Sequence, residues 1–316
     1  MIDGYGRKID YLRVSVTKRC NLNCSYCGAE CERDSELTGD EILKLVSTFA
    51  KLGITKVRLT GGEPLVRSDI CEIAEGISKI QGIKKLALTT NGVLLSRYAE
   101  RLKKAGVNAV NISLDTTDRQ QYKEITGADL LGKVYEGIDE AERVGLSPIR
   151  LNAVLIRGQN DDQAEKLISI ARDRKIDVRF IELMPFSDEG DNERLVIKGK
   201  EILGQFPFLK EFESDKKGSF EKSVARYYTA EGFKGRIGFI TPVSDKFCGD
   251  CNRIRLLSDG KVKPCLGNGR VFDLKEYLDD EGLLLKKAEE AILSKPTGHQ
   301  FDCGYGHSHG LNKIGG

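Results

Sequence analysis

The chain has 316 residues, of which 40% are hydrophobic and 31% are charged, and its formal net charge is +2. This length and composition are typical of a globular protein with about two domains. The small net charge argues neither for nor against nucleic-acid binding, so an anion site must come from arginines that cluster locally. No apolar run approaches the about 18 residues of a membrane span, and the polar residues 1–8 do not resemble a signal peptide. We therefore expect a cytoplasmic protein without a membrane partner. A nucleic-acid partner is not expected either.

Three cysteines, Cys20, Cys24 and Cys27, follow directly after the first predicted strand, which spans residues 11–17. Thiolates favour zinc or iron–sulfur clusters. A 4Fe-4S cluster has four irons, so three thiolates leave one iron open to a small chelating molecule. The alternative is a structural zinc site completed by Cys31, although zinc sites usually pair cysteines as Cys-x2-Cys, with a second pair or two histidines further on.

The Cys-x3-Cys-x2-Cys spacing, with Tyr26 just before the third cysteine, resembles the radical S-adenosylmethionine (SAM) superfamily. The resemblance implies that the amino and carboxylate groups of SAM chelate the open iron, and that Tyr26 belongs to the SAM site. An electron from the cluster would then break the sulfonium C–S bond and give a 5′-deoxyadenosyl radical. In such enzymes the cofactor supplies the difficult chemistry, and the protein positions the reactants. Cys31 has no assigned role.

Short β-branched runs alternate with amphipathic stretches from residue 9 to about residue 185. One amphipathic stretch, residues 39–52, follows a capping box formed by Thr38 and Glu41 and is expected to be a helix. The strand–helix order predicts parallel strands joined by right-handed crossovers. Six units rather than eight predict an α/β fold, a partial (β/α)6 TIM-like barrel, with its active face at the C-terminal ends of the strands. The resemblance implies that this barrel is of the radical SAM type. The six predicted strands span residues 11–17, 56–60, 85–90, 108–114, 149–156 and 177–183.

Small or polar residues end the predicted strands. The second strand ends in a Gly-Gly-Glu-Pro segment that begins with Gly61 and Gly62, and two adjacent glycines let a backbone edge approach a ligand closely. A turn without a function is the alternative. The resemblance implies that this segment, including Gly62, binds the amino group of SAM. By the same positional resemblance, Ser113 meets the ribose or carboxylate of SAM, and Met184 lies near its adenine.

A charged region that contains glycines, residues 186–222, interrupts the alternation and is expected to be a crossover. We place a soft domain boundary near residue 218. This boundary predicts a radical SAM barrel in residues 1–218 and a smaller C-terminal cluster-binding domain in residues 219–316.

A second cysteine group, Cys248, Cys251 and Cys265, lies beyond this boundary. A Ser-Asp-Gly turn predicts a hairpin of residues 253–257 and 261–264, which would fold Cys265 back onto the other two cysteines. A zinc site that borrows Cys303 or His307 is the alternative to a second cluster. The chain has nine cysteines in uneven groups, which indicates metal ligands in a reducing compartment rather than a disulfide framework.

Several independent features together resemble one family, the GTP 3′,8-cyclases of molybdenum cofactor biosynthesis, also called the MoaA family. The family pattern combines a SAM-type cysteine triplet, a C-terminal Cys-x2-Cys-x-Arg-x-Arg…Cys group and a terminal Gly-Gly. The resemblance covers nearly the whole chain, and it is more specific than the SAM motif alone. The residues that match are Cys20, Cys24, Cys27, Cys248, Cys251, Arg253, Arg255, Cys265, Gly315 and Gly316.

The family resemblance also implies a set of substrate contacts. Four arginines, Arg13, Arg58, Arg150 and Arg179, lie within or beside apolar strands, where a guanidinium is costly unless it meets an anion. A triphosphate would supply that anion, because the arginine fork matches phosphate oxygens. The alternative is that each arginine lies on a solvated strand face. The family often carries lysine at Arg150, so there only the charge matches. The implied GTP contacts are Arg13, Arg58, Thr89, Arg150, Arg253 and Arg255, with Lys56 and Arg179 nearby.

The implied reaction begins when the deoxyadenosyl radical removes the 3′ hydrogen of GTP. The ribose radical attacks guanine C8, and reduction gives (8S)-3′,8-cyclo-7,8-dihydroguanosine 5′-triphosphate, the first step of molybdopterin synthesis. A second 4Fe-4S cluster would bind the guanine ring. The residues implied to act in catalysis are Arg13, Arg253, Arg255, Gly315 and Gly316. The implied partners are a low-potential electron donor of the flavodoxin or ferredoxin type and a downstream cyclic pyranopterin monophosphate synthase, and the resemblance also allows a homodimer.

Two rival interpretations explain part of the sequence. A radical SAM enzyme that modifies a peptide with an auxiliary iron–sulfur cluster would account for both cysteine groups, but not for the Arg-x-Arg pair or the terminal glycines. A non-enzymatic two-cluster electron carrier would use four cysteines per cluster, and it would not need a six-unit barrel.

Overall fold

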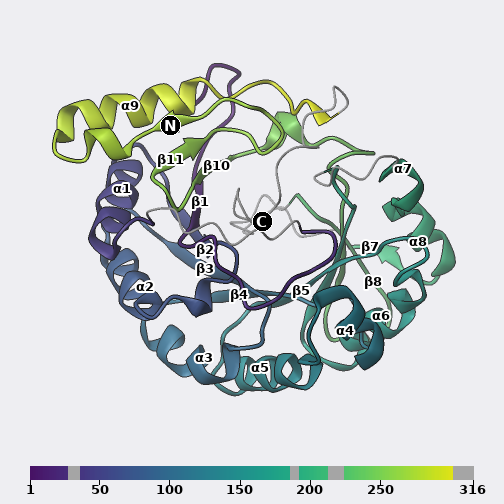
Figure 1. The fold of residues 1–316 in the computed structure, drawn as a ribbon. Coiled ribbons are helices and arrows are strands. Elements are labelled where there is room, and N and C mark those ends of the chain that lie inside the picture. The colour runs from purple at the N-terminus through teal and green to yellow at the C-terminus, as the bar shows by residue number, and fades with distance from the viewer. Residues whose placement is uncertain (28–35, 186–191, 213–223, 302–316) are drawn as a thin grey trace.

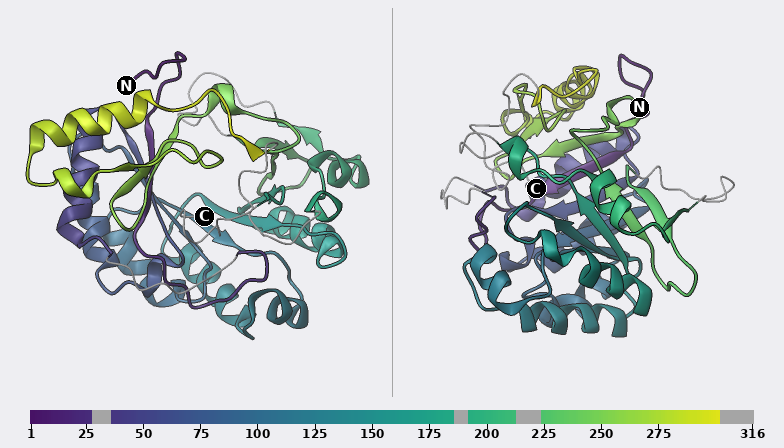
Figure 2. Two further views of the ribbon diagram at one scale, coloured as in Figure 1. Left: turned by 45° about the horizontal axis from the view of Figure 1, so that its top comes forward. Right: turned by 90° about the vertical axis from the view of Figure 1, so that its right-hand side faces the viewer.

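The computed structural model describes residues 1–27, 36–185, 192–212 and 224–301. The strands of these residues form one 12-stranded mixed sheet, in the order β12-β11-β10-β1-β2-β3-β4-β5-β6-β9-β8-β7. The sheet curves into an open arc, and the connecting helices cover its convex outer side (Figure 1, Figure 2). The concave side is left for a site.

The centre of the sheet consists of six parallel strands in chain order, which confirms the partial barrel of the radical SAM type. Helices join consecutive strands, so the strands all run in one direction and their C-terminal ends meet at one rim. The elements are β1 (Tyr11–Ser15), α1 (Gly39–Lys51), β2 (Lys56–Thr60), α2 (Ile70–Lys79), β3 (Lys85–Thr90), α3 (Leu95–Lys104), β4 (Ala109–Ser113), α4 (Arg119–Thr126), α5 (Leu131–Arg143), β5 (Ile149–Val154), α6 (Ala164–Asp173) and β6 (Asp177–Ile181).

Local sequence explains where these elements begin and end. The Thr38 side chain accepts from Glu41 N, and the Glu41 side chain accepts from Thr38 N, so the predicted capping box is present. The bounds of β2 and β3 agree with the prediction. Strands β1, β4, β5 and β6 end earlier than predicted, because the residues that follow them belong to the loops of the rim, and β4 also begins one residue later.

The C-terminal part of the chain extends both edges of the central sheet. Strand β9 pairs in parallel with β6, and β10 pairs in parallel with β1. Strands β10 and β11 form the predicted hairpin. Strand pairing therefore continues past the predicted domain boundary; residue 218 itself lies outside the described residues, and the boundary stays a prediction. The elements are α7 (Asn192–Leu195), α8 (Gly199–Gln205), β7 (Lys210–Glu211), β8 (Arg226–Thr229), β9 (Ile237–Ile240), β10 (Arg253–Leu256), β11 (Lys261–Lys263), β12 (Phe272–Asp273) and α9 (Glu281–Leu293).

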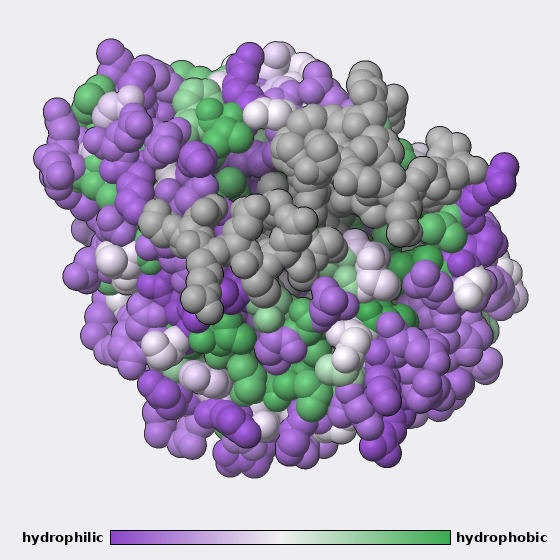
Figure 3. Space-filling model, in the orientation of Figure 1, coloured by the Kyte–Doolittle hydropathy of each residue, from purple (hydrophilic) through white to green (hydrophobic). Residues whose placement is uncertain are grey.

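The main hydrophobic core lies between the sheet and the outer helices. Helix α1, for example, buries Ile42, Leu45, Val46 and Phe49, which recur at helical spacing. The outer helices present mostly hydrophilic residues to solvent (Figure 3). No helix in the described part of the chain is long and apolar enough to span a membrane.

Candidate active site

A cavity of about 420 Å³ lies inside the barrel. It extends from the rim at the C-terminal ends of the strands down to residues that begin them, such as Tyr11, Lys56 and Lys85. Every predicted site residue that the structure describes lines this cavity. These are Arg13, Cys20, Cys24, Tyr26, Cys27, Arg58, Gly62, Thr89, Ser113, Arg150, Met184, Cys248, Cys251, Arg253, Arg255 and Cys265. The predicted Gly315 and Gly316, and the alternative ligands Cys31, Cys303 and His307, lie outside the described residues.

The first cysteine triad, Cys20, Cys24 and Cys27, lies in the loop after β1. Cys27 N donates to Cys24 O at 3.0 Å, and Asn91 Nδ2 lies 3.9 Å from Cys20 Sγ. Burial raises the pKa of the Cys20 thiol, and burial followed by the negative charge of Asp115 raises the pKa of the Cys24 thiol. Thiols in such surroundings ionise readily only when a metal supplies positive charge, so this set of donors fits a metal centre.

Among the residues that the structure describes, no group of three or more His, Cys, Asp or Glu side chains is arranged to hold a single metal ion. The zinc alternatives depend on Cys31, Cys303 or His307, which lie outside the described residues. Zinc therefore stays an alternative to an iron–sulfur cluster at each triad.

The glycine pair after β2 is required by the chain itself. Gly61 has a φ of +155°, and a Cβ at this position would lie 2.4 Å from Thr17 O. A Cβ at Gly62 would lie 2.3 Å from Arg19 O and 2.5 Å from Lys18 O. Both distances are far below van der Waals contact, so this segment packs directly against the backbone that leads into the first triad. The sequence analysis attributed the glycines to a ligand or to a turn and did not predict this contact.

Glu63, which follows the glycines, joins two strand ends beside the first triad. The side chain is 1% exposed, and it accepts from Leu65 N at 3.0 Å, Thr90 Oγ1 at 2.7 Å and Asn91 N at 2.6 Å. Burial raises the pKa of Glu63 to about 7, although these hydrogen bonds oppose the shift. Asn91 in turn reaches Cys20. Glu63 thus connects the ends of β2 and β3 to the cysteine loop.

Tyr26 is held by a partner that the sequence did not reveal. Its hydroxyl donates to Asp115 Oδ2 at 2.7 Å, and Asp115 Oδ1 accepts from Val154 N at 2.8 Å. Burial raises the pKa of Asp115 to about 6. Asp115 lies just after β4, among the polar residues that end the strands, and this position was the available signal. Asp115 thus holds the ring of Tyr26 at the rim of the barrel.

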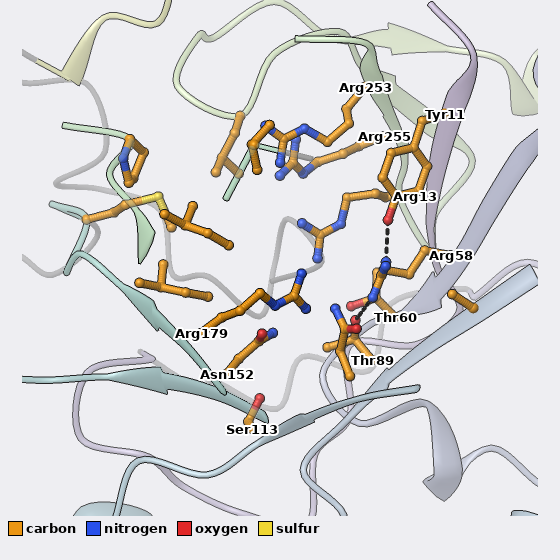
Figure 4. Close-up of a pocket in the computed structure, with 18 of the residues that line it drawn as sticks. Tyr11, Arg13, Arg58, Thr60, Thr89, Ser113, Asn152, Arg179, Arg253 and Arg255 are labelled. Atoms are coloured by element: carbon orange, nitrogen blue, oxygen red, sulfur yellow. Dashed lines mark hydrogen bonds between the residues drawn. The ribbon is translucent and has the colours of Figure 1, made fainter. Parts of the chain in front are cut away.

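Strand register gathers the arginines on one side of the sheet. Arg255 of β10 is paired with Arg13 of β1, which is paired with Arg58 of β2. Asn152 of β5 is likewise paired with Arg179 of β6. The side chains point into the same cavity (Figure 4). Residues that face each other on adjacent strands share one face, so this arrangement follows from the pairing of β10 with β1, which local sequence does not specify.

Several arginines of this cluster are buried close to one another, and the pKa values of Arg13, Arg179 and Arg255 are lowered. Arg150 is 4% exposed, Arg179 8% and Arg255 6%, which excludes a solvated strand face for these three. Burial, with further contributions from neighbouring arginines, lowers the pKa of Arg179 and of Arg255 to about 10. Burial followed by Arg255 also lowers the pKa of Arg13. Buried like charges of this kind are expected where an anion binds.

Several donors in the cluster have no hydrogen-bond partner among the described residues. They are Arg179 Nε and Nη2, Arg253 Nε and Arg255 Nε. Arg58, in contrast, is oriented by Tyr11, whose hydroxyl accepts from Arg58 Nε, and by Thr89 Oγ1 at 3.3 Å from Arg58 Nη1 (Figure 4). A buried donor without an acceptor is costly. The cavity therefore presents the donors that a polyanion would satisfy.

The second triad, Cys248, Cys251 and Cys265, lies just before β10 and just after β11 and lines the same cavity. Cys248 begins a short 3-10 turn and Cys251 follows it, and Cys251 N donates to Cys248 O at 3.2 Å. Cys265 follows the hairpin of β10 and β11. Burial opposes ionisation of Cys251, but Arg253 and then Lys295 bring the pKa of this thiol down to about 6. A thiol already poised as a thiolate is a suitable metal ligand.

Comparison with protein families divides the chain into two matches. The radical SAM superfamily matches residues 14–171, and the family described as Molybdenum Cofactor Synthesis C matches residues 176–301. Curated relatives match over nearly the whole chain, and these relatives are named GTP 3′,8-cyclase. GTP 3′,8-cyclase of Alkaliphilus oremlandii is 46% identical over 100% of both chains, and that of Peptoclostridium acidaminophilum is 43% identical over 100% of this chain and 98% of the relative.

Among solved structures, SuiB of Streptococcus suis bound to S-adenosylmethionine has a TM-score of 0.62 at 17% identity, covering 86% of this chain and 65% of that one. SuiB bound to its precursor peptide SuiA has a TM-score of 0.61 at 18% identity, covering 91% and 67%. At this level of identity the likeness concerns the fold alone.

Proposed function

The chain belongs to the GTP 3′,8-cyclase family of radical SAM enzymes, and from this membership we propose that it converts GTP into (8S)-3′,8-cyclo-7,8-dihydroguanosine 5′-triphosphate, the first step of molybdenum cofactor biosynthesis. The observation that carries the proposal is the cluster of buried arginines in a cavity that both cysteine triads line. Neither SAM cleavage nor electron transfer alone explains why buried arginine nitrogens lack acceptors among the described residues. A triphosphate substrate would supply those acceptors.

The first triad, Cys20, Cys24 and Cys27, would hold a 4Fe-4S cluster with one open iron. The donor set fits this group, because the three cysteines lie in one loop after β1 and all of them line the cavity. When bound, the cluster and SAM together supply the radical that removes a hydrogen atom from the substrate. The chain's own contribution is to hold the cysteine loop, through the glycine contact with Arg19 O and through Tyr26 and Asp115.

The residues proposed to contact SAM are Tyr26, Gly62, Ser113 and Met184. Their support is positional, since all four line the cavity near the C-terminal ends of the strands. At the same rim, β4 ends at Ser113. A backbone edge at Gly62 suits the SAM amino group, because Gly62 lines the cavity at the end of β2.

The triphosphate of GTP is proposed to bind Arg13, Arg58, Arg150, Arg253 and Arg255, with Thr89 as a further contact. Bidentate guanidinium contacts would satisfy the orphaned nitrogens of Arg253 and Arg255 and offset the repulsion within the cluster. Arg179, with two nitrogens that lack a partner among the described residues, joins this set. Anchoring the phosphates fixes the ribose relative to both triads, and such orientation favours an intramolecular ring closure.

The second triad, Cys248, Cys251 and Cys265, would hold a second 4Fe-4S cluster, and its open iron would bind the guanine ring. The fit rests on the donor set, since the three cysteines lie beside the hairpin of β10 and β11 and all of them line the cavity. Gly315 and Gly316 are proposed to reach the active site and to position GTP, because a side-chain-free tail enters a narrow space beside a nucleotide.

The proposal extends to partners that no feature of the fold displays. A low-potential donor of the flavodoxin or ferredoxin type would reduce the first cluster, and a cyclic pyranopterin monophosphate synthase would consume the product. A cytoplasmic location agrees with nine unevenly grouped cysteines, of which six are proposed as metal ligands rather than as disulfide partners. A homodimer is compatible with the proposal but is not needed for it, because one chain contributes all the residues named.

Transfer of label tests the proposal. Reconstituted protein, reduced with dithionite under anaerobic conditions, is incubated with SAM and with GTP deuterated at C3′. Deuterium is expected in the 5′-deoxyadenosine formed, because the 3′ hydrogen is the atom removed. Formation of 5′-deoxyadenosine without deuterium, at the same rate with and without GTP, would contradict the assignment of GTP as the substrate.

A further inference from the structure

A lysine near the C-terminal end of the described chain, Lys295, binds the backbone on both sides of the second triad. Its side chain is fully enclosed, with the residue only 2% exposed. Nζ donates to Arg253 O at 2.8 Å and to Pro264 O at 2.8 Å. Arg253 lies two residues after Cys251, and Pro264 lies directly before Cys265. One ammonium group therefore fixes the separation of the two segments that carry these cysteines.

The third cysteine is fixed from the same place by a residue at the other end of the chain. Arg7 Nη1 donates to Cys248 O at 3.0 Å, and Arg7 Nη2 donates to Pro296 O at 2.7 Å and to Lys295 O at 3.3 Å. Asp3 holds the guanidinium, with Oδ2 accepting from Arg7 Nε at 2.7 Å and both side chains buried. The start of the chain and the segment after α9 lie on the same side of the molecule in both views (Figure 1, Figure 2).

Lys295 forms no ion pair with a carboxylate among the described residues. An ammonium group has three donors, and carbonyl groups occupy two of them. Burial lowers the pKa of Lys295, and the charges of Cys251 and Cys265 oppose that shift. A buried cation without a partner acid is expensive. Its location suits a negatively charged group bound between these cysteines.

We propose that Lys295 is a positioning residue of the second triad, which holds Cys251 and Cys265 at the spacing a cluster needs and raises the reduction potential of that cluster through its charge. The inference rests on the proposed function in one respect, namely that this triad holds an iron–sulfur cluster. A cation beside a cluster stabilises the form that has gained an electron, and hydrogen bonds and charge near the sulfurs are established determinants of cluster potentials. Lys295 acts through the triad and need not touch the substrate.

The experiment uses the full chain in a background where Cys20, Cys24 and Cys27 are all alanine, so that only the second cluster contributes to the signal. Lys295→Met removes the charge and both hydrogen bonds at nearly equal volume, and Lys295→Arg retains the charge. Lys286→Met, at an exposed position of α9, is the matched control. Each protein is reconstituted and titrated with dithionite, and the midpoint potential and the electron paramagnetic resonance spectrum of the reduced cluster are recorded.

The proposal predicts that Lys295→Met lowers the midpoint potential and changes the spectrum, that Lys295→Arg stays close to the parent, and that Lys286→Met changes neither. A purely structural role would alter thermal stability without moving the potential. An unchanged potential and spectrum in Lys295→Met, with the parent carrying a cluster, would overturn the inference and leave the proposed function intact.

Two further outcomes are kept distinct. Absence of a cluster from the parent itself would overturn both the second-cluster part of the proposed function and this inference. Should Lys295→Met fail to fold, as judged by circular dichroism, Lys295→Gln replaces it, because glutamine removes the charge while retaining one hydrogen-bond donor. The same two criteria then apply.

Discussion

Replacing Arg179 by methionine separates substrate recognition from folding, because this arginine lies away from the residues that surround the cysteines. The residues whose charges act on it are Tyr227, Arg150, Arg58 and Tyr11, and no cysteine is among the leading contributions. Two of its nitrogens, Nε and Nη2, lack a hydrogen-bond partner in the described part of the chain. Methionine retains much of the aliphatic stem that packs near Gly238.

The expected loss follows from those two donors. A hydrogen bond to a charged group contributes about 1.5–3 kcal/mol, so two bonds to phosphate oxygens correspond to about 3–6 kcal/mol. The lower figure alone weakens the dissociation constant for GTP about 100-fold, since each 1.4 kcal/mol is a factor of ten. Stability without GTP should stay the same or rise, because burial and neighbouring arginines hold the pKa of Arg179 at about 10 and so disfavour its charge in the folded state.

The assay compares Arg179→Met with Arg97→Met, which alters an exposed arginine on α3. Isothermal titration with GTP measures affinity, and thermal unfolding without nucleotide measures stability, while iron content confirms that both proteins are equally loaded. A melting temperature several degrees lower in Arg179→Met, with GTP affinity unchanged, would show that the arginine supports the fold and would refute the reasoning.

Three other predictions concern the cysteine triads, the glycine contact and the tail. Cys265→Ala should keep about half of the iron and still cleave SAM, uncoupled from GTP; loss of all iron would end the two-site interpretation. Gly62→Ala should lose the first cluster, because a Cβ would lie 2.3 Å from Arg19 O, and full absorbance of that cluster with normal SAM cleavage would contradict the role of this contact. Deletion of Gly315 and Gly316 should leave iron content and SAM cleavage intact while the cyclised product disappears, and product at the wild-type yield would show that the tail is dispensable.

Much of the barrel could be predicted because its signals are local. The Thr38 and Glu41 capping box and the β-branched runs specify helix starts and strands within a few neighbouring residues. The same alternation placed the cysteine loop, the glycine pair and Ser113 at one rim, and the cavity includes them all. Parallel strands have their C-terminal ends at the same rim of the barrel. The position of these residues could therefore be predicted without knowing any contact between distant segments.

What the sequence did not reveal depends on pairing between distant segments. Arg255, Arg13 and Arg58 form a row because β10 pairs with β1. In the sequence, all the other strands of the barrel lie between these two strands. Arg7 and Lys295 belong to opposite ends of the described chain. In the sequence each resembles an ordinary surface cation, but both are buried in the structure. No local pattern distinguishes a buried lysine that binds two carbonyls from a solvated one.

The central claim is that this cavity closes a ring within GTP. The most direct measurement is to incubate the reconstituted, reduced protein with SAM and GTP under anaerobic conditions and to identify the nucleotide product by mass spectrometry and nuclear magnetic resonance. The account predicts a nucleotide of the same mass as GTP with a new bond between C3′ and C8, formed with one equivalent of 5′-deoxyadenosine. Unchanged GTP recovered alongside 5′-deoxyadenosine from a protein with both clusters in place would contradict it.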